Sequence, residues 1–327
     1  MTSPRIAIAG CKHTTKELIA SLRREGLSID HCITISAEKA RSQEVAGYLD
    51  LRPYLDSINT PYTIANKYSL LDEGDRQGIT EQKLDLLLVM GWQRLIPDWF
   101  LETLRFGAFG MHGSSLPLPH GRGRSPLNWS LIQDKKQFYT HLFQYLPGVD
   151  DGPIAGVMTF DITPFDTCLT LHYKNTVAMA KLCVEVIPKI LSGSAVLTPQ
   201  PKEGATYYPK RSREDGAIFW ADSAQTIYNL VRAVTKPFPG AFATLANHSE
   251  LEVTIWRAIP FDTQLSWPHA APGLILETFE NGDFLVQTGD FPLLVQEYEM
   301  NSRGTLSVGA RLGDGLPNRK VWANLPA

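Results

Sequence analysis

The chain has 327 residues, 43% of them hydrophobic and 20% charged, which is typical of a globular protein with room for two domains. Its net charge of −3 provides no basic field of the kind that binds nucleic acid or an anionic membrane. Its four cysteines lack metal-ligand spacing, so we expect reduced, buried thiols and no metal site. Because no apolar run would span a bilayer and no signal-peptide core is present, we expect a cytoplasmic protein.

Apolar stretches that alternate with helical patterns predict an α/β fold with a parallel sheet in the first half of the chain. The first strand ends at Gly10 in a turn that lacks the further glycines of a dinucleotide-binding fingerprint, which disfavours NAD and FAD. Strands are expected at residues 5–10, 27–36, 83–92, 108–111, 140–146 and 156–162. Helices are expected at residues 14–24, 45–51 and 96–101, from a Ser125 cap to Ile132, and from an Asp166 cap to Gly193.

The second half changes character after a polar, proline-rich stretch at residues 198–204. This stretch predicts a linker between a domain at 1–197 and a domain at 205–327. A helix at 223–234 is followed by short alternating segments at 251–259, 273–278, 284–288 and 293–299. Short strands at close spacing predict a small antiparallel β-barrel.

Two glycine-rich stretches contain the candidate catalytic residues. Residues 109–117 begin like a strand end and then turn into Gly, His, Ser and Pro, which do not continue a central strand. We therefore expect His112 to project from the carboxyl edge of the sheet, where open α/β folds bind ligands. Asp150 lies in a glycine-flanked turn at the tip of a predicted hairpin. The two residues suit a proton-transfer pair; two unrelated polar loops are the alternative.

The same stretches resemble motifs of the formyltetrahydrofolate-dependent formyltransferases. Gly-Met-His-Gly-Ser-Ser-Leu-Pro at 110–117 is similar to the family's Asn-X-His-X-Ser-X-Leu-Pro, and Asp-Asp-Gly at 150–152 to its Asp-X-Gly turn. Residues 122–129 and 230–242 resemble the branch that contains the formyltransferase domain of the bifunctional UDP-4-amino-4-deoxy-arabinose enzyme. The resemblance implies a Rossmann-like formyltransferase domain followed by a small, OB-fold-like β-barrel.

The resemblance also implies a catalytic trio of Asn, His and Asp. This chain keeps His112 and Asp150 but has Gly110 in place of the asparagine, whose amide would donate a hydrogen bond to the oxyanion. A water or Asn128 is the expected substitute, and glycine would also open space above His112 for a larger substrate. Folate contacts are expected from Trp92, Gln93, Arg94, Leu95 and Asp150, and substrate contacts from Ser114, Arg122, Arg124 and Asn128.

Arg122 and Arg124 are the expected phosphate ligands, since guanidinium pairs bidentately with phosphate oxygens; a solvated loop is the alternative. The implied function is formyl transfer from 10-formyltetrahydrofolate, as co-substrate, to the amine of a nucleotide-linked amino sugar. Neither a metal nor nucleic acid is expected to take part, and a homodimer is one option for the assembly. The alternatives are methionyl-tRNA formylation, hydrolysis of formyltetrahydrofolate, and a catalytically silent binding protein.

Overall fold

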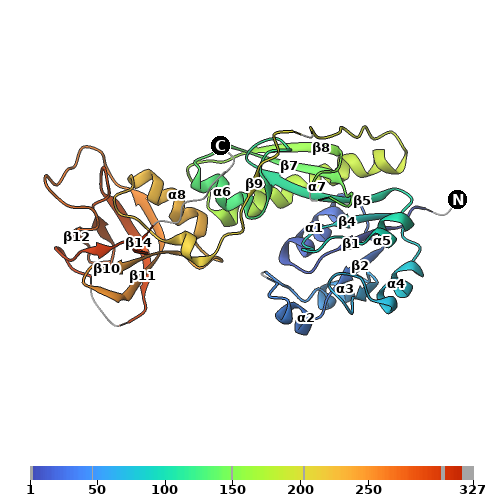
Figure 1. The fold of residues 1–327 in the computed structure, drawn as a ribbon, viewed down its shortest axis with the longest axis horizontal. Coiled ribbons are helices and arrows are strands. Elements are labelled where there is room, and N and C mark those ends of the chain that lie inside the picture. Colours follow the sequence, from blue (N-terminus) through green and yellow to red (C-terminus); the bar gives the residue numbers. More distant parts are fainter. Residues whose placement is uncertain (1–2, 46, 149, 202, 303–305, 319–327) are drawn as a thin grey trace. The chain divides into compact units, whose positions relative to one another are not determined.

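The computed structural model describes residues 3–45, 47–148, 150–201, 203–302 and 306–318 and divides into two compact units (Figure 1). Unit 1 contains Met1–Arg122, Tyr139–Phe160 and Tyr173–Ala205, and unit 2 contains Gly123–Phe138, Asp161–His172 and Thr206–Ala327. The two units therefore interleave along the chain. The contiguous domain boundaries at 197 and 205 stay a prediction.

The larger sheet has seven strands in the order β3-β2-β1-β4-β5-β7-β8. Strands β1 to β5 pair in parallel, and β7 pairs antiparallel with β5. The strands are β1 (Ile6–Ala9), β2 (His31–Thr34), β3 (Tyr62–Ile64), β4 (Leu86–Val89), β5 (Gly107–Ser114), β7 (Gln137–Gln144) and β8 (Ile154–Asp161). The helices of this part of the chain are α1 (His13–Arg24), α2 (Ala37–Ser42), α3 (Arg52–Ser57), α4 (Glu73–Thr80), α5 (Asp98–Thr103) and α7 (Cys168–Leu191).

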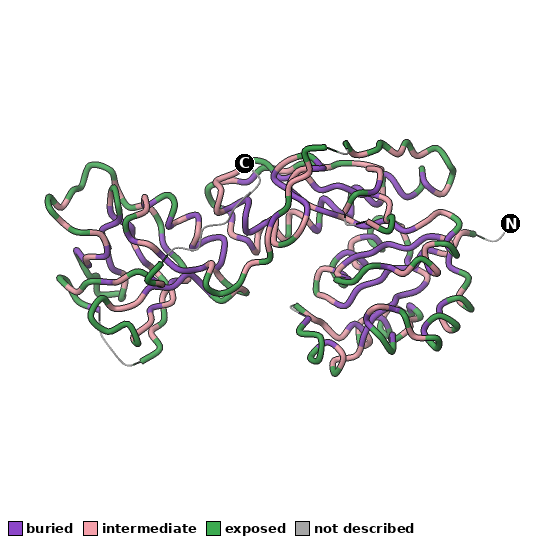
Figure 2. The backbone as a smooth tube through the Cα atoms, in the orientation of Figure 1, coloured by how far each residue is buried: buried purple, intermediate pink, exposed green. Residues whose placement is uncertain are grey.

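Side chains of the parallel strands alternate between two hydrophobic cores, one on each face of the sheet. The residues of these strands are mostly buried (Figure 2). Leu86 and Leu88 pack into the core that includes residues of α1 and α7, whereas Leu87 and Val89 pack into the core that includes residues of α4 and α5. Ala108 belongs to the second core. Because side chains two residues apart share a face of a strand, Gly110 and His112 lie on that face as well.

Two elements predicted in this part of the chain were wrong. Residues 45 and 47–51 are not helical: Glu44 and Gly47 have positive φ values of 49° and 71°, which interrupt a right-handed helix. Strand β5 does not end at Met111 but continues to Ser114, because its residues from Phe109 onward pair with β7. His112 therefore lies within a strand rather than in the loop after it.

Two predicted helix caps also differ. Helix α6 (Pro126–Ile132) begins and ends as expected, but Ser125 has a φ of 58° and its side chain makes no capping hydrogen bond. At α7 the cap is Thr167, whose carbonyl accepts from Leu171 N and whose hydroxyl accepts from Thr170 N. The Asp166 carboxylate binds Thr163 N instead.

Unit 2 contains a six-stranded antiparallel sheet in the order β12-β13-β14-β11-β10-β15. Hydrogen bonds from Ile275 N to Ala310 O and from Leu312 N to Gly273 O draw its two edges together, so the sheet curls into a partial barrel, as predicted. Its strands are β10 (Ala241–Leu245), β11 (His248–Pro260), β12 (Ile275–Thr278), β13 (Phe284–Val286), β14 (Leu293–Met300) and β15 (Leu312–Gly313). Helix α8 (Ala224–Val234) packs against β11, and the short strands β6 (Arg122–Gly123) and β9 (Tyr207–Tyr208) form a separate two-stranded sheet.

Arg232 on α8 is a buried charge that joins segments of unit 2. Its Nη1 donates to the carbonyl oxygens of Thr163, at 2.9 Å, and Asp166, at 3.2 Å. Its Nη2 lies 3.5 Å from an Asp134 carboxylate oxygen. Burying a charge is favourable only when such partners satisfy it. We therefore assign Arg232 a structural role.

Replacing Arg232 with methionine should lower the stability of the chain by about 3 kcal/mol, because the carbonyl groups and the carboxylate that it binds would lose their partner. Urea denaturation of the full chain measures the effect. Arg257→Met is the matched control: Arg257 lies in the exposed pair with Glu297, at 3.8 Å, and should cost less than about 1 kcal/mol. Equal losses in the two variants would contradict the structural role of Arg232.

Candidate active site

His112 lies just beyond the carboxyl end of the parallel strands. The last parallel pair of β4 and β5 is Val89 with Gly110, and His112 follows two residues later on the same face of β5. Its side chain is 8% exposed. This placement at the carboxyl edge confirms the position predicted for His112.

The two ring nitrogens of His112 have different surroundings. Nε2 lies 2.8 Å from the carbonyl oxygen of Gly121, which can only accept a hydrogen bond, so Nε2 carries the hydrogen. In the neutral ring, Nδ1 then holds a lone pair, and it lies 3.5 Å from Asp150 Oδ2. The predicted proximity of His112 and Asp150 is confirmed. Nδ1 is the ring nitrogen that can take up a proton, and the Asp150 carboxylate lies next to it.

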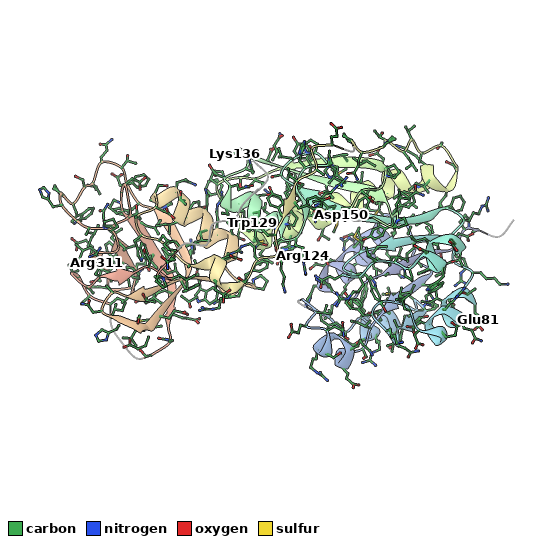
Figure 3. All side chains as sticks on the ribbon, viewed as in Figure 1. Glu81, Arg124, Trp129, Lys136, Asp150 and Arg311 are labelled. Carbon is green, nitrogen blue, oxygen red and sulfur yellow. The ribbon has the colours of Figure 1, made fainter. Side chains whose placement is uncertain are left out.

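The Asp150 loop, residues 145–148 and 150–153 between β7 and β8, is held by a side chain from far along the chain. Asp150 is labelled in Figure 3. Gln200 Nε2 donates to the carbonyl oxygens of Asp150, at 2.9 Å, and Gly152, at 2.7 Å. A Cβ atom at position 152 would lie 1.7 Å from Gln144 O, so only glycine fits this turn. Gln200, within the predicted linker, is thus a positioning residue that the sequence analysis missed.

Arg122 continues this network. Its side chain is buried, and Nη2 donates to Gln200 Oε1 at 2.6 Å. The guanidinium thereby orients the Gln200 amide, so that the amide nitrogen points to the carbonyl oxygens of the Asp150 loop. This contact gives Arg122 a positioning role, and its expected role as a phosphate ligand stays a prediction.

His141 supports the backbone of His112 from the neighbouring strand, to which it is directly paired. Its Nε2 accepts from Leu118 N at 3.2 Å, so its Nδ1 carries the hydrogen that is donated to His112 O, also at 3.2 Å. Burial lowers the pKa of His141 to about 4, and the ring is neutral near pH 7. The alternating pattern of 140–146 predicted a buried face, but gave no sign of this bridging role.

Tyr145 occupies the space beside Gly110. A Cβ atom built on Gly110 would lie 1.9 Å from Tyr145 Cε2 and 2.9 Å from its Cζ. The ring stacks on Phe143 with 5.4 Å between centroids, and Phe143 is the direct cross-strand partner of Gly110. The expectation that glycine opens room for a larger substrate was wrong, because an aromatic ring of this chain fills that room.

The predicted folate-binding residues follow β4 at the same carboxyl edge. Trp92 is buried against Tyr68, and its Nε1 has no hydrogen-bond partner within the described part of the chain. Gln93, Arg94 and Leu95 are exposed, Leu95 by 57%. The three exposed residues offer polar and apolar surface, but their binding role stays a prediction.

The remaining predicted substrate contacts differ in accessibility. Ser114 is fully buried, and its hydroxyl accepts from Leu116 N. Asn128 is buried as well, and its Nδ2 donates to Ala233 O at 2.6 Å, which ties α6 to α8. The substrate roles expected of both residues, and that of Asn128 as the substitute oxyanion donor, stay predictions. Arg124 is exposed (Figure 3) and stays a candidate phosphate ligand.

Across the described residues, no helix is long and apolar enough to cross a membrane. The same residues include no group of three or more His, Cys, Asp or Glu side chains that could hold a metal ion.

Comparison with known proteins identifies relatives of both halves of the chain. The model of the formyl transferase family matches residues 5–187, and the model of the formyl transferase C-terminal domain matches residues 210–311. HypX from Aquifex aeolicus, crystallised with tetrahydrofolic acid, is 16% identical with a TM-score of 0.64, over 92% of this chain and 45% of its own. The present chain thus spans less than half the length of HypX.

Two further structures match over almost their whole length. The N-formyltransferase from Helicobacter canadensis, in complex with folinic acid and dTDP-3-aminofucose, is 15% identical with a TM-score of 0.61, over 90% of this chain and 99% of its own. Methionyl-tRNA formyltransferase from Clostridium thermocellum is 19% identical with a TM-score of 0.54, over 91% of this chain and 99% of its own. Identities this low show a shared fold.

Proposed function

Because the chain belongs to the formyl transferase family, we propose that it transfers a formyl group from 10-formyltetrahydrofolate to the amine of a nucleotide-linked amino sugar. The matches to the two family models confirm the predicted family and the predicted enzyme class, a formyltransferase. The co-substrate of this class is a formyltetrahydrofolate. The identity of the acceptor, an amino sugar, is our proposal.

The observation that carries the proposal is the arrangement of His112. Attack of an amine on a formyl carbon produces a cationic nitrogen and an oxyanion, and the nitrogen must lose a proton. With Nε2 bound to the Gly121 carbonyl, His112 accepts that proton on Nδ1. The ring remains in place during the transfer, because Nε2 keeps its hydrogen bond in both protonation states.

Asp150 stabilises the imidazolium that results. Its carboxylate lies 3.5 Å from Nδ1, a distance at which opposite charges attract strongly in a partly buried site. His112 then returns the proton to the leaving nitrogen of the donor, so that one residue serves as base and then as acid. The hydrogen bond from Gln200 Nε2 to Asp150 O keeps Asp150 positioned next to the His112 ring.

Residues 92–95 are the candidate contacts for the pterin of the donor. Leu95 supplies exposed apolar surface, and the neighbouring Gln93 and Arg94 supply exposed polar groups, a combination typical of cofactor sites. They follow β4, whose neighbour β5 carries His112. The chain therefore presents a candidate donor site and a proton acceptor at one edge of one sheet.

The acceptor is inferred from chemistry and from similarity. The Helicobacter canadensis enzyme, crystallised with dTDP-3-aminofucose, matches 90% of this chain. The net charge of −3 lacks the basic excess that favours binding to a tRNA backbone. Both observations favour a small, activated amino sugar over methionyl-tRNA.

The experiment is an assay of the purified chain with 10-formyltetrahydrofolate and a panel of UDP-, dTDP- and GDP-linked amino sugars, read by mass spectrometry of the acceptor. Formylation of at least one sugar is expected. Formylation of methionyl-tRNA alone would replace the proposed acceptor. Release of formate and tetrahydrofolate without an acceptor would identify a hydrolase.

Arg124 is the candidate ligand for the sugar diphosphate, since it is exposed and guanidinium binds phosphate oxygens bidentately. Arg124→Ala should raise the KM for the nucleotide sugar about tenfold or more and leave the KM for folate unchanged. Arg94→Ala is the matched control, with the opposite expectation because Arg94 lies in the predicted folate segment. If Arg124→Ala changes only the folate KM, the arginine belongs to the donor site.

A further inference from the structure

The site described so far has no assigned hydrogen-bond donor for the oxyanion. The oxyanion of the tetrahedral intermediate requires a hydrogen-bond donor near the base, and Gly110 has no side chain to supply it. Asn128 is buried, and its amide nitrogen already donates to Ala233 O. The face of the sheet that carries His112 offers another candidate.

Tyr145 stands in the space that a side chain at position 110 would fill. The would-be Cβ lies 1.9 Å from Cε2, 2.8 Å from Cδ2 and 2.9 Å from Cζ of its ring. The edge of the ring next to the hydroxyl therefore occupies the path that an asparagine side chain would take. Position 145 is the diagonal neighbour of position 110 across the β5–β7 pair, on the face shared with His112.

We propose that the Tyr145 hydroxyl donates the hydrogen bond to the oxyanion that forms when the amine attacks the formyl carbon. The inference rests on the proposed function and names the donor for that same site. In this arrangement a small residue at 110 and a tyrosine at 145 replace one side-chain amide. The glycine is then required by the tyrosine, rather than being a damaged catalytic position.

The surroundings of Tyr145 suit this role. Its backbone N donates to Ala108 O at 2.8 Å, and its ring stacks on Phe143, so it is held firmly. Burial, and in second place the charge of Asp150, raise the pKa of Tyr145, so the hydroxyl keeps its hydrogen at neutral pH. Within the described part of the chain the hydroxyl makes no hydrogen bond, and it is available to a ligand.

Tyr145→Phe separates the hydroxyl from the ring that fills the space. We expect kcat for formyl transfer to fall by a factor on the order of 10²–10³, as when an oxyanion donor is removed from other enzymes. The KM values for both substrates and the melting temperature should stay the same, because the ring still packs over Gly110. Tyr139→Phe, a tyrosine on the same face of β7, is the matched control and should keep kcat within about twofold of wild type.

The outcomes distinguish this proposal from the proposed function. If wild type transfers formyl and Tyr145→Phe retains kcat within about threefold, the hydroxyl is not the donor and the function stands. If Tyr145→Phe lowers the melting temperature and kcat together, and Tyr139→Phe does the same, the effect is structural and the proposal is overturned. If wild type transfers formyl to no acceptor, the proposed function fails, and the role of Tyr145 fails with it.

Discussion

Replacing either His112 or Asp150 with asparagine should lower kcat roughly a hundredfold or more while leaving the chain folded. Without His112 the attacking nitrogen has no group to take its proton. Without the Asp150 charge, 3.5 Å from Nδ1, the imidazolium loses its partner and forms less readily. Steady-state assays at saturating folate and acceptor, with circular dichroism as the check on folding, measure the effect.

The losses of kcat in the two single variants should not add up in the double variant, because residues that act as one unit show strongly non-additive losses. Asp151→Asn is the matched control: Asp151 is the adjacent, exposed carboxylate and should leave kcat within a few-fold of wild type. Rates near wild type for His112→Asn would place the base elsewhere.

The His112–Asp150 pair could be predicted because each residue stands in a glycine-rich stretch next to an apolar strand, a pattern visible along the chain. The interactions that hold the pair could not. Arg122 and Gln200 are 78 residues apart in the chain, and neither carries a local signal that it binds the other. An arginine in a glycine-rich loop is typical of a phosphate ligand; only the folded chain reveals that it is buried.

The length of β5 illustrates a second limit. Gly, His and Ser after Met111 disfavour the continuation of a strand by composition alone. The antiparallel partner β7 supplies the hydrogen bonds that extend the strand through Ser114. Pairing between strands thus outweighed the local preference, and it set the alternation that places Gly110 and His112 on one face.

The relation between Gly110 and Tyr145 was hidden for the same reason. From the sequence, Gly110 was a departure from the family motif, with a water or Asn128 as the expected substitute donor and open space for the substrate as a further expectation. The alternation of 140–146 implies that His141, Phe143 and Tyr145 share a face, but not which residue of β5 they oppose. The register of β5 and β7 decides it, since it sets Phe143 opposite Gly110 and brings Tyr145 over the glycine.

Gly110→Asn tests whether the position of the Tyr145 ring requires glycine at residue 110. The new Cβ would lie 1.9 Å from Tyr145 Cε2, so the ring must move away from its position beside residue 110. We expect kcat to fall about tenfold or more and stability to fall by roughly 1–3 kcal/mol, as for other overpacked sites. Kinetic assays and urea denaturation measure the two effects. Gly78→Asn is the control, because nothing lies within 4 Å of a Cβ at that position.

The double variant Gly110→Asn/Tyr145→Ala separates loss of the donor from loss of packing. Removing the ring leaves space for the asparagine, whose amide can then donate to the oxyanion in place of the hydroxyl. The kcat of the double variant should therefore exceed that of Gly110→Asn and that of Tyr145→Ala, although each added change alone is harmful. A gain in kcat from Gly110→Asn alone would contradict this account, because it would mean that glycine, and not the ring over it, limits the native rate.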